Sequence, residues 1–98
     1  MSLRQREPRQ KDARHLDFIR SLPCCICGDN TTTEAAHLRT SKIELGKDDH
    51  GWGRPSDKWV LPLCGRHHRE QHMMNEMAFW ESYGIDPFML ALTMRARS

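Results

Sequence analysis

The fold is decided by the stretch LPLCGRHHREQH, residues 61–72, which changes from apolar to cysteine–histidine to charged side chains. The apolar run at 59–63 has the length and composition of a buried strand. The dipeptide Cys64-Gly65 follows as a turn, and the residues after it predict a helix from about 67 to 82. The apolar stripe of this helix is expected to consist of Met73, Met77 and Trp80, which recur at helical spacing.

Two pairs of metal-ligating residues occur at matching spacing. Cys24 and Cys27 form a C-x-x-C in a turn-rich segment, and Cys64 and His67 form a C-x-x-H at the predicted strand–helix junction. Two thiolates at this spacing can face one ion across a tight turn, and closed sets of four sulfur and nitrogen ligands are typical of structural zinc. The spacing therefore predicts a zinc site with three cysteine ligands and one histidine.

The sequence leaves other arrangements of the same residue types open. Cys25 can take the place of Cys24, and His68 can take that of His67. A site with two cysteines and two histidines would leave the C-x-x-H unused and would consist of Cys24, Cys27, His68 and His72. Its gap is longer than in the usual zinc finger signature. The cysteines can also be buried, reduced thiols that bind no metal.

Three histidines and one carboxylate form a second candidate group. His68 and His72 are four positions apart on the predicted helix, so their rings share one face and can hold one divalent ion. His37 ends a strand predicted at 31–37, and a histidine near a metal site can deprotonate water. Asp57 can supply an oxygen ligand to the same ion, or it can be a solvated loop carboxylate or a helix cap.

Length and composition fit one small domain. The chain has 98 residues, and domains of this size often gain stability from a metal or a disulfide. Neither a secretory signal nor an apolar run of about 18 residues is present, which predicts a cytoplasmic protein without a membrane span. In that compartment clustered cysteines and histidines favour metal binding over disulfides.

The rest of the chain is predicted from charge and turn signals. The formal net charge of +2 carries little information, but the first residues are rich in arginine, so 1–12 is predicted as a flexible basic arm before a domain at 13–98. That domain should contain a short helix within 12–22, a long loop at 40–58, and a last helix from Asp86 to about 95.

The order of these motifs resembles the HNH endonucleases. Three segments carry the likeness: AHLR at 36–39, the glycine-rich GWGRPSD at 51–57 and LPLCGRHHREQH at 61–72. All three follow the C-x-x-C knuckle in the sequence. It is closer to the small phage and prophage members, which include the recombination-enhancement nucleases, and it covers residues 23 to about 83. The resemblance implies an α+β fold of the ββα-metal (His-Me finger) class with flanking helices, in which a hairpin and one helix enclose a catalytic divalent ion.

The resemblance also implies an activity, namely metal-dependent hydrolysis of phosphodiester bonds in DNA within a bacterial host cell. His37 would be the general base. His68 and His72 would hold a catalytic ion such as Mg²⁺, Mn²⁺ or Zn²⁺, and the structural zinc would hold the two halves together. Asp57, or a water molecule, can supply an additional oxygen ligand to that ion. No major-groove recognition motif is evident, so a protein partner is one source of specificity.

Two departures from the family pattern keep an alternative function open. Many HNH members carry Asp, Glu or His directly before the general base, where this chain has Ala36, and the family's asparagine is missing near Trp59. The chain can therefore be a non-catalytic zinc module that binds nucleic acid, or a structural zinc domain that acts through a protein partner. If the chain cleaves or binds nucleic acid, phosphate contacts are expected from Arg39, Arg54, Lys58, Arg66 and Arg69.

Overall fold

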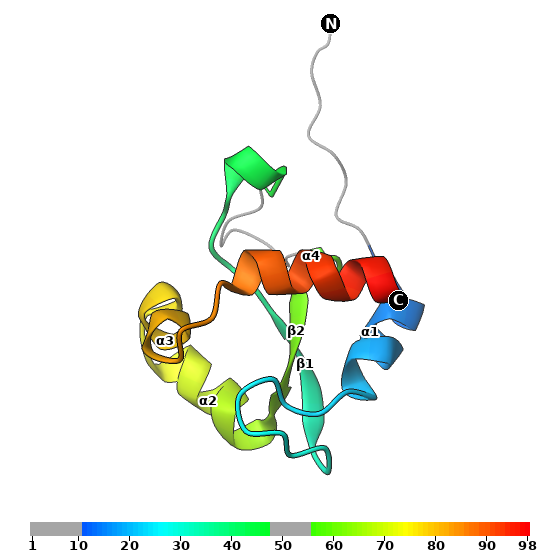
Figure 1. Cartoon of the computed structure of the whole chain (residues 1–98), viewed down its shortest axis with the longest axis vertical. Coiled ribbons are helices and arrows are strands. Elements are labelled where there is room, and N and C mark those ends of the chain that lie inside the picture. The colour runs from blue at the N-terminus through cyan, green and yellow to red at the C-terminus, as the bar shows by residue number, and fades with distance from the viewer. Residues whose placement is uncertain (1–10, 48–55) are drawn as a thin grey trace, which may run out of the picture.

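The computed structural model describes residues 11–47 and 56–98. It is a small α+β structure in which a two-stranded antiparallel sheet is surrounded by helices (Figure 1). The elements follow one another in the order α1 (Ala13–Arg20), β1 (Thr33–His37), the 3-10 turn η1 (Ile43–Leu45), β2 (Val60–Cys64), α2 (Gly65–Met73), α3 (Glu76–Ser82) and α4 (Pro87–Arg97). Every helix in these two described segments is too short or too polar to pass through a bilayer.

The sheet is a hairpin whose second strand is its buried centre. β1 pairs with β2 so that Thr33 lies opposite Cys64 and His37 opposite Val60. All residues of β2 are buried, which explains why this strand is an unbroken apolar run and not an alternating one. Pro62 donates no ladder bond, but its carbonyl accepts the backbone N–H of Cys25 at 3.0 Å, which fastens the cysteine knuckle to the strand.

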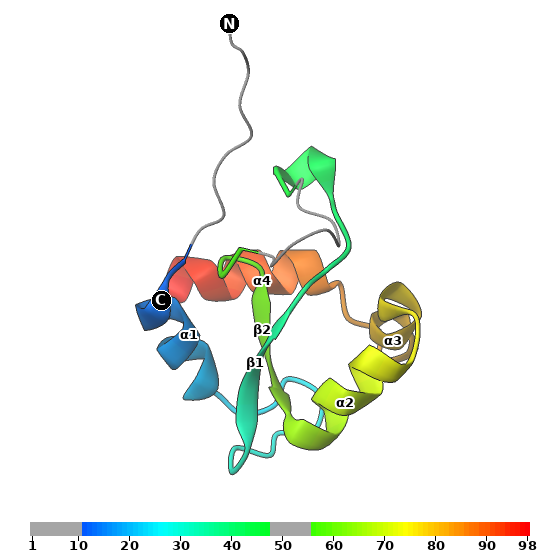
Figure 2. The same ribbon diagram turned by 180° about the vertical axis from the view of Figure 1, so that it is seen from behind.

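The helices enclose the hairpin from several sides. Figures 1 and 2 show α1 beside one side of the strands, the α2–α3 pair beside the other, and α4 crossing one face. α1 contacts both strands and α4 contacts β2. The buried core between these elements consists of Ala36, Leu38, Trp59, Leu61, Leu63, Phe79, Trp80, Phe88 and Ala91, together with Cys24 and Cys64.

The helix predicted from 67 to 82 is two helices, and its predicted stripe is wrong at the first position. α2 ends at Met73, Met74 is extended with φ −139° and ψ 173°, and α3 begins after Asn75. The Asn75 side chain accepts the Ala78 N–H at 2.9 Å and so caps the new helix. The break leaves Met73 84% exposed, while Trp80 reaches the core from α3.

Other predicted elements are confirmed with small changes of boundary. The last helix starts at Pro87, and the Asp86 side chain accepts the N–H groups of Phe88 and Met89. The strand predicted at 31–37 begins two residues later, because Thr31 is held in a turn by the Asp29 carboxylate. Residues 1–10 of the predicted arm, and 48–55 of the predicted loop, lie outside the described part of the chain.

Candidate functional site

The cysteine–histidine cluster predicted from sequence is assembled in the structure. The four ligand atoms of Cys24, Cys27, Cys64 and His67 all lie within 4.8 Å of one another. The first two residues come from the turn after α1, and the other two come from the end of β2 and the first turn of α2. Cys24, Cys64 and His67 are buried, while Cys27 is on the surface.

The turn that carries the first two cysteines directs its amides at a sulfur atom. The N–H of Ile26 points at Cys24 Sγ from 3.4 Å, and the turn closes where Gly28 N–H donates to the Cys24 carbonyl at 2.8 Å. Gly28 has φ +81°, a conformation that favours glycine. Burial acts to raise the pKa of the Cys24 thiol, but backbone N–H groups, including those of Cys27 and Ile26, hold that pKa below its ordinary value. The turn therefore favours a thiolate.

The distances within the cluster fit one tetrahedral ion. With Zn–S bonds of roughly 2.3 Å and Zn–N bonds of roughly 2.0–2.1 Å, a tetrahedron has S···S edges of about 3.8 Å and S···N edges of about 3.6 Å. Here Cys27 Sγ lies 3.9 Å from Cys64 Sγ, and His67 Nδ1 lies 3.7 Å from Cys24 Sγ and 3.2 Å from Cys64 Sγ. The donor set thus fits a metal such as zinc.

The two residues that were alternative ligands stand outside this cluster. Cys25 is half-buried, and desolvation together with the neighbouring Cys24 raises the pKa of its thiol to about 12, so it is a protonated thiol at neutral pH. His68 turns its ring to Glu34, away from the sulfur atoms. Among the described residues, no other group of three or more metal-ligating side chains comes as close together.

His68 and His72 form a pair on the exposed side of α2. His68 Nε2 lies 3.3 Å from His72 Nε2, and the ring centroids are 4.9 Å apart. The Glu34 carboxylate lies 2.7 Å from His68 Nδ1. When Glu34 accepts the proton on Nδ1, the lone pair of His68 Nε2 faces His72, where it can accept a hydrogen bond or bind a metal.

The charge state of His72 favours a metal ligand. Burial, the nearby Arg39 and the neighbouring His68 lower the pKa of His72, so its ring is neutral at physiological pH. Neutral imidazole is the form that binds metals. Two nitrogen ligands at roughly 2.0–2.1 Å from one tetrahedral ion lie about 3.3 Å apart, and the two Nε2 atoms show that separation.

Asp57 is placed with His37 and not with the helix pair. Its Oδ1 lies 2.9 Å from His37 Nε2, and its Oδ2 accepts the backbone N–H of Asp12 at 2.8 Å. The Asp57 side chain is 6% exposed, and that of His37 is 30% exposed. The expectation that Asp57 joins His68 and His72 as a metal ligand is thus not met, because both of its oxygens are engaged elsewhere.

The three histidines of the second candidate group therefore do not converge in this structure. His37 and Glu34 have opposite parity on β1, so their side chains leave opposite faces of the strand. Because Glu34 contacts His68, the helix pair lies on the Glu34 face, which is also the face of Ala36. His37 reaches Asp57 on the other face.

The basic residues predicted to contact phosphate differ in their exposure and in their contacts. Arg39 is partly exposed, with its Nε 3.8 Å from Glu76. Lys58 is half-buried and extends over the Trp59 ring at 5.3 Å. Arg66 and Arg69 are exposed on α2, and Arg54 lies outside the described residues.

Two acidic residues were missed in the sequence. Glu34 was detectable, because it lies two positions before Ala36 and so shares a strand face with it. Glu76 is buried, and its carboxylate accepts the backbone N–H groups of Arg39 and Thr40. No local sequence signal predicts this contact, because the residues are more than thirty positions apart.

The fold and the cluster define a small α+β protein with a candidate metal site of three cysteines and one histidine. The chain belongs to the family described as "Protein of unknown function (DUF968)", whose model matches residues 2–98. It is similar to "Uncharacterized protein YdfU" of Escherichia coli (strain K12), with 32% identity over 72 residues, which is 72% of this chain and 18% of that protein. The chain thus spans less than a fifth of that relative's length. No solved structure matches it.

Proposed function

We propose that this domain is a metal-dependent endonuclease that hydrolyses phosphodiester bonds in DNA. The observation that carries the proposal is the His68–His72 pair, whose facing Nε2 atoms are 3.3 Å apart. The pair lies on α2, the helix that directly follows the hairpin, and its first member, His68, is the residue after the candidate zinc ligand His67. The arrangement supports a second, open metal site beside a closed structural one.

The carboxylate of Glu34 takes a supporting role in this proposal. By accepting the Nδ1 proton of His68, it orients the ring and raises the basicity of the nitrogen that would bind the ion. Glu34 stands on the strand face of Ala36, so it offers negative charge near the position where the HNH pattern has a ligand. A divalent ion held there would polarise a phosphate and stabilise the charge that develops on it.

His37 and Asp57 have the arrangement of a general base and its orienting carboxylate. If the buried Asp57 carboxylate accepts the Nε2 proton of His37, the Nδ1 atom is left free to take a proton from water. The ring is partly exposed, so water can reach it. Phosphate contacts in this proposal come from the exposed Arg66 and Arg69 on α2 and from Arg39 after β1.

A second function, binding of nucleic acid without cleavage, is favoured by the placement of His37. This histidine leaves β1 on the face opposite to Glu34, and Ala36 offers no ligand to an ion at the helix pair. In this structure the His37 ring contacts Asp57 and the helix pair contacts Glu34, and a base and an ion held apart in this way would not act on one phosphate. In that case the zinc cluster and the arginines of α2 would serve binding alone.

The two functions are separated by cleavage of supercoiled plasmid with zinc-loaded protein and added Mg²⁺ or Mn²⁺. The nuclease proposal expects nicking that is lost in His72→Ala and in His37→Ala, while circular dichroism and zinc content are unchanged. Met73→Ala is the matched control, because Met73 neighbours His72 and is 84% exposed. Salt-sensitive DNA binding with no cleavage under either ion would instead assign the non-catalytic module.

A further inference from the structure

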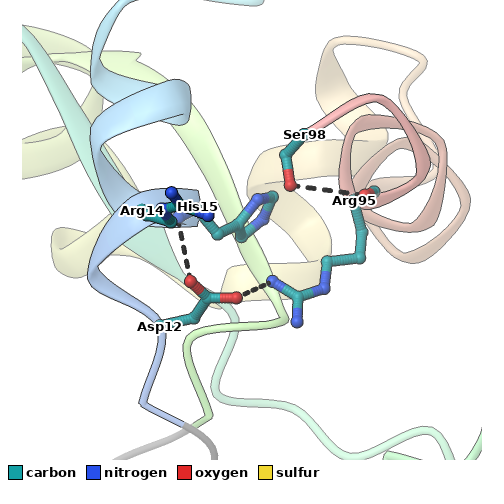
Figure 3. A pocket seen from close by; sticks show the side chains of 5 residues that line it. All are labelled: Asp12, Arg14, His15, Arg95 and Ser98. Carbon is teal, nitrogen blue, oxygen red and sulfur yellow. Dashed lines mark hydrogen bonds and ion pairs between the residues drawn. The ribbon is translucent and has the colours of Figure 1, made fainter.

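A polar pocket lies where the start of α1 meets the end of α4, away from the cysteine–histidine cluster. Its volume is about 330 Å³, and it is lined by Asp12, Arg14, His15, Arg95 and Ser98 (Figure 3). All of these residues are polar or charged. Small-ligand sites usually measure roughly 300–1,000 Å³ and are mostly apolar, so this pocket fits a small, polar ligand.

His15 is the unusual member of this pocket. Its side chain extends from α1 toward Ser98 and Arg95 (Figure 3). The residue is only 1% exposed, yet neither ring nitrogen has a hydrogen-bond partner among the described residues. Buried polar groups are nearly always hydrogen-bonded, because an unsatisfied one costs about 1–3 kcal/mol. A ligand that accepts a hydrogen bond from this ring would remove that cost.

The charges around the ring favour an anion. The Asp12 carboxylate is engaged, since Oδ2 accepts Arg95 Nη1 at 2.7 Å and Oδ1 accepts the His15 backbone N–H at 3.1 Å. The buried Asp57 carboxylate also acts on the ring from the β2 side, but it too holds two hydrogen bonds. Arg14 is exposed at the pocket, and its charge is not offset by an ion pair among the described contacts of the lining residues. The start of α1 adds partial positive charge and the end of α4 adds partial negative charge, so the exposed guanidinium of Arg14 decides the sign.

We propose that this pocket binds a phosphate oxyanion, with Arg14 and the His15 ring as its ligands. The site is distinct from the metal centre and does not depend on the proposed nuclease activity. A bound oxyanion would also favour the protonated ring, which burial and Arg95 disfavour in its absence. Free phosphate and the phosphodiester backbone of DNA offer the same chemistry.

The test follows the ring nitrogen signals of ¹⁵N-histidine-labelled, zinc-loaded protein by NMR during titration with inorganic phosphate, without added Mg²⁺ or Mn²⁺. The His15 signals are assigned by their loss in His15→Gln. The proposal expects saturable shifts of these signals, and binding about fivefold weaker in Arg14→Gln, as expected for loss of one charge-assisted hydrogen bond to an exposed arginine. Arg20→Gln is the matched control on the same helix, and it should bind like the wild type.

A second arm titrates a short DNA duplex without terminal phosphates. If the duplex shifts the same signals and free phosphate reverses the shift, the occupant is a backbone phosphodiester. If only inorganic phosphate shifts them, the occupant is a free phosphate or a phosphomonoester. Absence of any shift of the His15 signals up to tens of millimolar phosphate, or equal weakening in Arg14→Gln and Arg20→Gln, overturns the proposal. Because cleavage is not measured, failure here leaves the nuclease proposal unaffected.

Discussion

Replacing the buried Glu76 with glutamine is expected to destabilise the domain by about 3 kcal/mol. Its carboxylate, which is 6% exposed, accepts the N–H of Arg39 at 3.0 Å, and the N–H and hydroxyl of Thr40 at 2.9 and 2.7 Å. It also accepts the Gln71 side-chain amide at 3.3 Å. These contacts fasten the segment after β1 to α3, two residues beyond His37.

The magnitude follows from what an amide can replace. A hydrogen bond to a charged group contributes roughly 1 kcal/mol more than a neutral one, and a buried donor left without an acceptor costs about 1–3 kcal/mol. Glutamine keeps one acceptor oxygen, so two or three bonds lose their charge assistance. Its new NH₂ group also faces donors. The sum is a large fraction of the roughly 5–15 kcal/mol that holds a domain together.

Urea unfolding of zinc-loaded protein, followed by the fluorescence of the buried Trp59 and Trp80, measures this loss. Glu81→Gln is the matched control, because Glu81 is exposed on the same helix and surface changes usually stay within about 0.5 kcal/mol. This prediction would be refuted if Glu76→Gln lowered the free energy of unfolding by less than about 1 kcal/mol, or if both variants lowered it equally. In either case the carboxylate would not be what holds the segment after β1 in place.

Three further outcomes are expected. Removal of the metal by a chelator, or Cys27→Ser, should abolish cooperative unfolding, because structural zinc contributes roughly 10–16 kcal/mol to folding in zinc-finger peptides. Retention of the native circular dichroism spectrum without metal would contradict this expectation. Gly84→Ala should cost about 1 kcal/mol in urea unfolding, because Gly84 has φ +69° at the end of α3 while nothing crowds the new methyl group; an unchanged midpoint would show that the strain is relieved. Burial and Arg95 lower the pKa of His15 from 6.5, so the folded protein binds fewer protons there than the unfolded chain as pH falls through that value. The free energy of unfolding should therefore rise with pH near 6.5 in phosphate-free buffer, and His15→Phe should reduce this slope to the part that the lowered pKa of His72 contributes.

The cysteine–histidine cluster could be predicted, because its ligand pairs are defined by short spacings in the sequence. Each pair of ligands stands on one tight turn, and a C-x-x-C or a C-x-x-H keeps its geometry wherever the turn is placed. The same spacing indicated His67, but it left His68 open as a substitute. In the structure the His68 ring contacts Glu34 of β1, thirty-four residues earlier in the chain.

The helix break at Met74 shows the limit of periodicity. Met73, Met77 and Trp80 recur at helical spacing, so the sequence is compatible with one long helix. The chain does not continue that helix. It forms the buried contact between Glu76 and the segment after β1, and Asn75 caps α3. Asn75 followed by Glu76 was a readable cap signal, but only the tertiary contact shows that it outweighs helix continuity.

The placement of Asp57 connects the candidate base to elements at both ends of the chain. Asp57 holds His37 with one oxygen and the Asp12 N–H with the other, and the Asp12 side chain in turn caps α1 and pairs with Arg95 of α4. Because each of these contacts fixes the next, α1 and α4 contribute to the position of an imidazole that belongs to the hairpin. A fragment limited to the hairpin and α2 would therefore keep the His68–His72 pair but would lose the contacts of Asp12 that help to hold Asp57 against His37.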